Sequence, residues 1–519
     1  MRMLANTCAI GELQARLRLW PAVVAAILLF FLLEAGAEAA DRIYWSNLTG
    51  NSISWANLDG SGGGNLPIDP AALDGPMGLA VDPQANHLFW ANYGIIGGAG
   101  TGVSIGVANL DGSGAHLLPV SGVPVRGPHG VAVDTVANRL YWTNHDDGSG
   151  DSWIGISKLD GSGAGYLNAG AATMNGPRGL ALDPGAGRIY WANWLGNAIS
   201  YAALDGSGGG DISTAGATVE NPEGVAVSPA QNRLYYGNFT FAGNPPAETI
   251  SYVRLDGGGG SDLPTGSATR VQPHGVAVDP EAGRVYWPNF DVGVISFAAL
   301  DGSGGADLPT SGATADGPNQ PILLKEPIPT GQPSIDGGAK PNSTLHCAHG
   351  KWAADQTASL LYRAPTSYSY RWERNGRTLP GADTASINVH SIGDFRCTVI
   401  AANPAGAANR RSPIHASFKL GKLRREPEQG TARLTVKLPD AGRLRLRGKG
   451  IAKQRALGAD ASASRKVKKG RAVLRVRPTG RLKHRLDHTG KVRVKVWVSF
   501  RPGGGDLGTQ ARVLRLIER

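Results

Sequence analysis

The chain has 519 residues, a length that favours three or four domains over one. Glycine contributes 74 residues while 41% of the chain is hydrophobic, which excludes a disordered protein and indicates many tight turns between buried strands. The net charge of +11 is strongly segregated. Residues 41–326 hold 11 basic and 26 acidic side chains (−15), residues 327–417 hold 9 and 5 (+4), and residues 418–519 hold 29 and 7 (+22). The sequence therefore predicts an acidic body followed by a very basic C-terminal domain.

The N-terminus has the pattern of an export signal. Arg2, Arg16 and Arg18 precede an apolar run over 22–33, and small residues follow at 37–39. Twelve apolar residues are fewer than the roughly 20 of a membrane span. We expect a cleaved signal peptide over 1–39 and a secreted protein, free or associated with the cell surface; an uncleaved anchor is the alternative. No later stretch is apolar enough to span a membrane, and the high Gly, Ala and Arg content favours a bacterial source.

Residues 41–325 repeat three short motifs. An aromatic pair occurs six times at spacings of 45 to 52 residues, with an Asn two positions after each pair and a Leu-Asp-Gly turn further on. The pairs are Tyr44-Trp45, Phe89-Trp90, Tyr141-Trp142, Tyr190-Trp191, Tyr235-Tyr236 and Tyr286-Trp287. A third motif, such as "GPHGVAVD" at 127–134, separates the repeats. Its small side chains suit a crowded innermost strand, and the aromatic pair suits the next strand outward. Periods of this length predict a propeller with one blade per repeat.

These motifs resemble the YWTD repeats, also called LDL-receptor class B repeats. The resemblance implies an all-β, six-bladed β-propeller over 41–325 that serves as an extracellular ligand-binding module. Asn stands where the family has Asp, so an ion pair between blades is in doubt here. The chain enters on an aromatic strand and leaves on an inner-type segment. We therefore expect residues 319–325 to pair beside 42–47 and close the ring.

A Pro- and Gly-rich linker over 326–337 leads to a second domain over 338–417. Cys347 and Cys397 are the two cysteines left after signal removal, and two cysteines in an exported chain suggest one disulfide. A Cys, a later Trp and a second Cys 50 residues on resemble an immunoglobulin-like sandwich. The resemblance implies that Trp372 packs against the disulfide. Phe395 stands where that family usually has Tyr. The hydrogen bond that this Tyr hydroxyl makes at a corner of the sandwich is therefore not expected here.

Residues 418–519 alternate apolar and basic side chains, as in "GKVRVKVWVSF" at 490–500. Period two predicts strands with one apolar and one cationic face, and hence a basic β-sandwich-like domain. Such a domain suits an anionic polymer or surface: teichoic acid, nucleic acid or lipid head groups. Docking on the acidic propeller, and a gain in solubility, are the alternatives. Trp497 is the only Trp and Tyr is absent, so stacking on single-stranded bases is disfavoured.

The residue before each inner strand is the candidate ligand site. In a propeller these positions form a ring at one mouth of the central channel, a concave place of the kind that ligands use. The ring comprises Met77, His129, Arg178, Glu223, His274 and, by alignment, Asn319. Arg178 and Glu223 are neighbours in the ring and are expected to pair. A polar rim without chemistry is the alternative interpretation. "PHG" before a "VAVD" strand also resembles streptogramin lyase-type propellers, which implies a possible catalytic His at the mouth.

No Ser-His-Asp order, HExxH motif, paired Cys ligands or phosphate loop is visible. The Leu-Asp-Gly carboxylates lack calcium-loop spacing and are predicted to form turns. The sequence thus predicts no enzyme, no metal and no cofactor. It predicts a secreted or cell-surface binding or adhesion protein, with an unknown protein or glycan ligand at the propeller and an anionic polymer or surface at the C-terminal domain. A propeller lyase or hydrolase acting at the channel mouth is the alternative.

Overall fold

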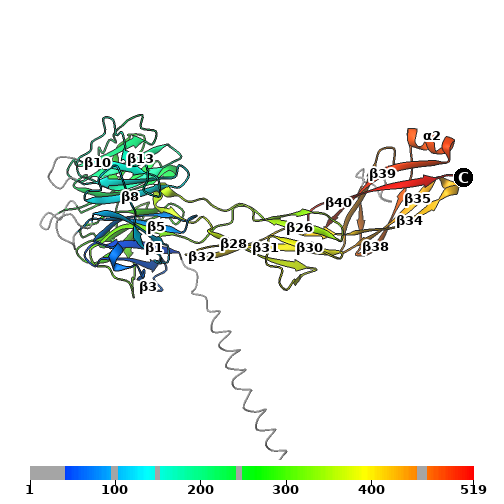
Figure 1. Cartoon of the computed structure of the whole chain (residues 1–519), viewed down its shortest axis with the longest axis horizontal. Helices are drawn as coiled ribbons and strands as arrows, with labels where there is room; N and C mark the ends of the chain where they lie inside the picture. Colours follow the sequence, from blue (N-terminus) through cyan, green and yellow to red (C-terminus); the bar gives the residue numbers. More distant parts are fainter. Residues whose placement is uncertain (1–40, 95–102, 146–151, 241–247, 453–463) are drawn as a thin grey trace, which may run out of the picture.

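The structure is a computed structural model that describes residues 41–94, 103–145, 152–240, 248–452 and 464–519. The predicted signal peptide over 1–39 lies outside these residues. Figure 1 shows three units in a row: a disc of radiating sheets, a slender middle unit, and a C-terminal unit that carries α2. No helix in the described part of the chain is long and apolar enough to cross a membrane.

The disc is a propeller of six antiparallel blades, as the repeats predict; five are four-stranded sheets, and the sheet of blade one has a fifth strand that runs parallel to its neighbour. In blades two to six the small-residue segment is the innermost strand, and in all six blades the aromatic pair lies on the next strand. Blade one holds β1 (Arg42–Asn47), β2 (Ser52–Asn57) and β3 (Gly63–Asn65); blade two holds β4 (Pro76–Asp82), β5 (His87–Asn92), β6 (Ser104–Asn109) and β7 (His116–Leu117); blade three holds β8 (Pro128–Asp134), β9 (Arg139–Asn144), β10 (Trp153–Ser157) and β11 (Gly165–Tyr166). Blade four holds β12 (Pro177–Asp183), β13 (Arg188–Asn193), β14 (Ala198–Ala203) and β15 (Gly209–Asp211); blade five holds β16 (Pro222–Ser228), β17 (Arg233–Asn238), β18 (Ile250–Arg254) and β19 (Gly260–Asp262); blade six holds β20 (Ala277–Asp279), β21 (Arg284–Asn289), β22 (Val294–Ala299) and β23 (Gly305–Asp307).

The ring closes as expected from the order of the motifs. Strand β24 (Pro318–Leu324) pairs antiparallel with β1, with Ile43 opposite Leu323 and Tyr44 opposite Ile322. The last segment of the repeat region therefore supplies the inner strand of blade one. Joining the two ends in one sheet leaves no open edge between the first and last blades.

The Leu-Asp-Gly carboxylates form turns, also as predicted. The Asp59 side chain accepts a hydrogen bond from the backbone N–H of Ser61 at 2.9 Å. The Asp160 and Asp301 side chains make the same bond with the residue two positions later, again at 2.9 Å. Each carboxylate thus satisfies a backbone donor of its own turn, which is the usual role of Asp at this place.

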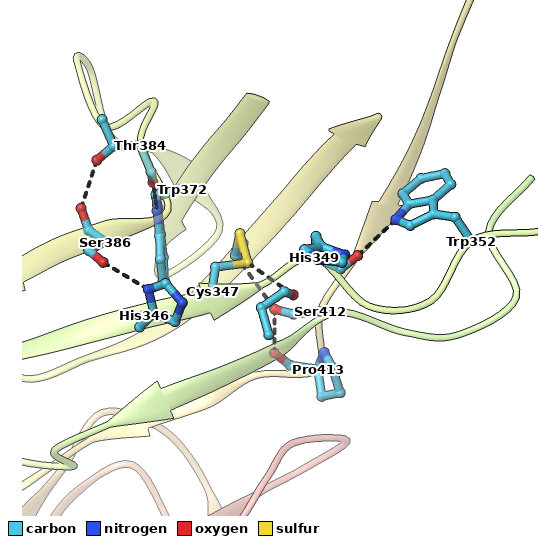
Figure 2. Close-up of a disulfide and its surroundings, with 11 residues drawn as sticks. His346, Cys347, His349, Trp352, Trp372, Thr384, Ser386, Ser412 and Pro413 are labelled. Atoms are coloured by element: carbon cyan, nitrogen blue, oxygen red, sulfur yellow. Dashed lines mark hydrogen bonds between the residues drawn. A yellow bond between two sulfur atoms is a disulfide. The ribbon is translucent and has the colours of Figure 1, made fainter. Parts of the chain in front are cut away.

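The middle unit consists of two sheets joined by a disulfide. One sheet has the order β25 (Ser334–Gly337), β26 (Ser343–Ala348), β30 (Ser386–Val389), and the other has β29 (Arg377–Thr378), β28 (Ser367–Arg374), β31 (Gly393–Asn403), β32 (Gly406–Arg411), with β33 (His415–Ser417) beside β31. The predicted disulfide joins Cys347 to Cys397, with Cα atoms 6.3 Å apart. Trp372 is fully buried opposite Cys397 and donates to the carbonyl of Thr384 at 2.8 Å (Figure 2).

The C-terminal unit also has two sheets around an apolar core. The first has the order β34 (Lys419–Glu426), β35 (Thr431–Leu438), β38 (Gly470–Val476), and the second has β37 (Ser464–Val467), β36 (Gly442–Gly448), β39 (Lys491–Pro502), β40 (Gly508–Ile517). A helix, α2 (Gly480–Thr489), interrupts the strands, although the sequence analysis placed only strands here. Leu482 and Leu486 lie four residues apart on its core-facing side, and Gly490 ends it with a φ of 64°. Because the sequence on both sides alternates with a period of two, the short helical periodicity of these residues was not recognised.

Residues 355–363 of the middle unit cover one end of the propeller, and we call them the cap. The cap contains η4 (Thr357–Ser359) and β27 (Leu361–Tyr362), which pairs parallel with β24. The Ser359 hydroxyl donates to the carbonyl of Val227 at 2.7 Å, near the end of β16. Leu360 and Leu361 are buried in the same apolar cluster as the blade residues. The cap therefore closes the end at which the inner strands finish.

Candidate functional site

The six predicted ring residues occupy equivalent places at the start of the inner strands. Five of them are the second residues of β4, β8, β12, β16 and β24: Met77, His129, Arg178, Glu223 and Asn319. His274 follows Pro273, which bridges to Asn289 just ahead of β20. The ring thus lies at the end of the propeller opposite the cap, and we call this end the mouth.

Direct contacts join most of the ring. The Asn319 amide nitrogen lies 2.8 Å from Nδ1 of His274 and 3.3 Å from the sulfur of Met77. Arg178 pairs with Glu223 through Nη1 and Oε1, as the sequence analysis expected. The side chains of Arg178 and Glu223 are only 12% and 3% exposed, so this ion pair is largely removed from water. The ring is therefore an ordered polar floor and not a set of separate surface side chains.

The two histidines of the ring are neutral at physiological pH. Burial lowers the pKa of His129 and of His274 well below the usual range, and the nearby positive charge of Arg178 lowers both further. With the Asn319 amide donating to Nδ1, the His274 proton lies on Nε2. That Nε2 is buried and has no hydrogen-bond partner among the described residues. It is a buried donor that the described side chains leave unsatisfied.

An aromatic collar surrounds the polar floor, and the sequence analysis missed it. The collar is made by the residue directly after each repeated Asn: Leu48, Tyr93, His145, Trp194, Phe239 and Phe290. Its rings contact the floor in turn. Phe290 stacks on His274 with centroids 4.4 Å apart, and Tyr93 meets His129 edge-on at 5.0 Å. The guanidinium carbon of Arg178 lies 4.1 Å above the ring of Trp194. The sequence did contain a signal for the collar, because five of the six residues that directly follow the repeated Asn carry an aromatic or imidazole ring.

The channel is closed directly beneath the floor. Five repeats have Gly after the ring position, but the last has Gln320, which is 4% exposed. A Cβ added at Gly179, Gly224 or Gly275 would lie 2.6–2.8 Å from the Gln320 side-chain oxygen. That oxygen therefore sits on the axis between three blades. The inner strands therefore pack closely around the Gln320 side chain just beneath the ring.

The mouth combines buried polar side chains with aromatic rings. Glu223 is the ring's carboxylate, and Arg178 already engages it. No group of three or more His, Cys, Asp or Glu in the described part of the chain could hold a metal ion. Leu195 and Val292, which follow collar residues, are 47% and 48% exposed. A polar floor, an aromatic collar and exposed apolar side chains beside it are typical lining for a bound partner.

Comparisons with known proteins find partial similarities. No family model matches the chain. Protein cueball of Drosophila erecta is 34% identical over 102 residues, which is 20% of this chain and 15% of that protein, and the Drosophila yakuba protein is 31% identical over the same length. The chain thus spans about a seventh of the length of these relatives. Among solved structures, a chain of a nidogen/laminin complex is 17% identical with a TM-score of 0.43, covering 55% of this chain and 98% of that chain. A putative 6-phosphogluconolactonase from Bacteroides fragilis is 13% identical with a TM-score of 0.37, covering 56% and 99%.

Proposed function

We propose that the chain is a secreted or cell-surface binding protein and not an enzyme. The mouth of the propeller takes a protein or glycan ligand, and the basic C-terminal unit attaches the protein to an anionic polymer or surface. In this proposal the propeller repeats are of the YWTD type and the disulfide-linked middle unit is immunoglobulin-like. The repeated Tyr-Trp-x-Asn motif and the Cys–Trp–Cys arrangement support these two assignments.

The observation that carries the proposal is the difference between the two ends of the propeller. The cap covers one end with buried Leu360 and Leu361. The other end presents the mouth, where the aromatic collar and the exposed Leu195 and Val292 surround the polar floor. Large aromatic side chains around a few fixed polar groups are the composition found where proteins bind partners.

A test begins with an array of glycans and proteins probed with the full secreted chain. The ligand found is then titrated against Trp194→Ala, which removes one collar ring, and Trp55→Ala as a matched control. Trp55 is also half-buried and stacks with an arginine, Arg42, but lies on β2 of blade one, away from the axis. We expect Trp194→Ala to weaken binding at least about tenfold and Trp55→Ala to change it less than about twofold. Equal losses in both variants would place the ligand elsewhere.

The enzyme alternative depends on the neutral histidines. A neutral imidazole with an unpaired nitrogen is suited to proton transfer, and Nε2 of His274 has no partner among the described residues. The test is a screen of small lactones and cyclic esters with the wild-type chain and the double variant His129→Gln/His274→Gln. We expect no turnover by either protein. Turnover by the wild type that the double variant loses would establish the lyase or hydrolase instead.

A further inference from the structure

The outer face of the sheet β37–β36–β39–β40 carries an ordered grid of cations. Arg443, Arg445 and Arg447 alternate along β36, so their side chains leave the same face at intervals of about 7 Å. Lys466 on β37 and Arg501 on β39 both lie opposite Arg443. Three cations thus form a row across three neighbouring strands, about 4.8 Å apart. The next two rows pair Arg445 with Ser499 and Arg447 with Trp497.

This arrangement of like charges destabilises the sheet when no anion is bound to it. Like charges directly opposite on adjacent strands repel each other. None of these five cations forms an ion pair among the residues that the structure describes. Nε of Arg445 is buried and also lacks a hydrogen-bond partner there. The neighbouring sheet differs, since Glu426 of β34 lies 2.6 Å from Arg433. The grid is therefore poised for anions from outside the chain.

The cation grid lines a groove that also contains aromatic and hydroxyl side chains. The groove has a volume of about 1270 Å³, larger than a typical small-molecule pocket, and no carboxylate is among its described lining residues. Trp497 lies in its wall with 39% of its surface exposed. Ser499 and Thr509 share a hydrogen bond of 2.8 Å on its surface. Guanidinium groups, one flat ring and two hydroxyls thus face the same space.

We infer that this groove binds an acidic polysaccharide, a chain of sugars bearing carboxylate or sulfate groups. The inference rests on the proposed attachment role of the basic unit and gives that role a site and a ligand class. Guanidinium groups bind such anions through paired, charge-assisted hydrogen bonds. The apolar face of a sugar ring fits on the indole of Trp497, and its hydroxyls suit Ser499 and Thr509. The groove's volume accommodates several sugar units in a row.

The single aromatic ring argues against the other polyanions. Binders of single-stranded nucleic acid stack successive bases on several aromatic side chains, whereas Trp497 is the domain's only Trp and the domain has no Tyr. A lipid surface is met by charges on a convex or flat face, whereas these cations line a groove. A polyphosphate chain has no ring to place on Trp497.

The experiment uses the full secreted chain and measures Kd for heparin, polygalacturonate, inorganic polyphosphate, a single-stranded DNA oligomer and anionic lipid vesicles. The groove variant is Arg443→Gln/Arg445→Gln/Arg447→Gln. Its control is Arg424→Gln/Arg481→Gln/Arg485→Gln, which removes the same charge from exposed positions on β34 and α2. Trp497→Ala is tested separately, and thermal unfolding of each variant confirms that it folds.

We expect the acidic polysaccharides to bind most tightly and to lose at least about tenfold in affinity in the groove variant, with less than about threefold in the control. Trp497→Ala should weaken polysaccharide binding about tenfold and leave polyphosphate binding unchanged. Equal losses in groove and control variants, an unaffected Trp497→Ala, or tighter binding of DNA or vesicles would each overturn the inference while leaving an attachment role intact. A wild type that binds none of the five probes at low salt would overturn the attachment role as well.

Discussion

In five of the six blades the repeated Asn donates a side-chain hydrogen bond that a carboxylate could not make; the exception is Asn144 of blade three, whose side-chain nitrogen is buried without a partner among the described residues. In blade four the Asn193 side-chain oxygen accepts from the backbone N–H of Asn175 at 3.0 Å. Its nitrogen donates to the hydroxyl of Ser200 at 2.8 Å, and Ser200 in turn donates to Asp211 at 2.5 Å. Blade six repeats the pattern with Asn289, Ser296 and Asp307. The amide is the donor that starts this chain of hydrogen bonds, which explains Asn at the position where YWTD repeats have Asp.

Replacing Asn193 by Asp should therefore destabilise the propeller. The variant keeps the acceptor but loses the donor to Ser200, and it brings a second carboxylate close to Asp211. We expect the free energy of unfolding to fall by about 1–3 kcal/mol in denaturant titrations. Asn168→Asp is the control, because Asn168 is exposed: the variant keeps the acceptor role toward Gly170 and loses only a solvent-exposed donor bond to the carbonyl of Gly206. It should change stability by less than about 0.5 kcal/mol. Similar losses in the two variants would contradict this account of the repeated Asn.

The repeats predicted the places of some single residues but not of others. The aromatic pairs and inner strands recur in every repeat, so their places followed from local pattern alone. The ring of Met77, His129, Arg178, Glu223, His274 and Asn319 followed from the same symmetry. Gln320 and the collar depend on how six blades converge on one axis. That convergence brings together side chains about 45 or more residues apart, a relation that no single repeat contains.

At the scale of elements, the cap ties the middle unit to the propeller. Leu323 N donates to the carbonyl of Leu360, and Lys325 N donates to that of Tyr362, both at 2.8 Å. Arg363 is fully buried and pairs with Glu281 at 2.6 Å. The sequence analysis assigned these residues to a separate sandwich. Their contacts join positions with no shared motif, so neither periodicity nor spacing could predict them.

We expect the substitution Leu361→Ala to destabilise the propeller, although Leu361 lies outside the repeats. Leu361 is fully buried among blade residues, and truncating such a side chain typically costs about 2–4 kcal/mol. Calorimetry should show the propeller transition at a lower temperature. Leu345→Ala, at an equally buried leucine in the core of the middle unit, is the matched control and should leave that transition in place. A propeller transition unmoved by Leu361→Ala would mean that the cap adds nothing to propeller stability.

At the scale of the whole molecule, the acidic and the basic parts of the chain form separate units with separate surfaces. The acidic propeller lies at one end of the row in Figure 1 and the basic unit, whose sheet lines the groove, at the other. The middle unit holds these surfaces apart through two junctions. One junction is the cap. The other is a polar cavity of about 340 Å³ lined by Glu373 and Asp394 of the middle unit and by Asp440 and Lys469 of the basic unit.

The second junction should respond to pH through Asp394. Burial, and then the neighbouring carboxyl of Asp440, raise its pKa to about 6, against the opposing charges of Lys469 and Arg396. The folded-state pKa therefore exceeds the ordinary value of 3.8. Between these two values the folded chain keeps a proton that the unfolded chain releases. Asp394 thus favours the folded state most below pH 4, and this contribution is lost as the pH rises from about 4 to about 6.

Asp394→Asn tests this sign directly, because an amide resembles the protonated carboxyl at every pH. At pH 4 the variant and the wild type should unfold at nearly the same temperature. At pH 7.5 the variant should be the more stable by about 1 kcal/mol, less than the full shift implies because Asp394 is partly exposed. Asp383→Asn, at an exposed carboxyl of the same unit, should show no such pH-dependent difference. If the variant were instead less stable than the wild type at pH 7.5, the ionised Asp394 would be stabilising the junction, most plainly through Lys469.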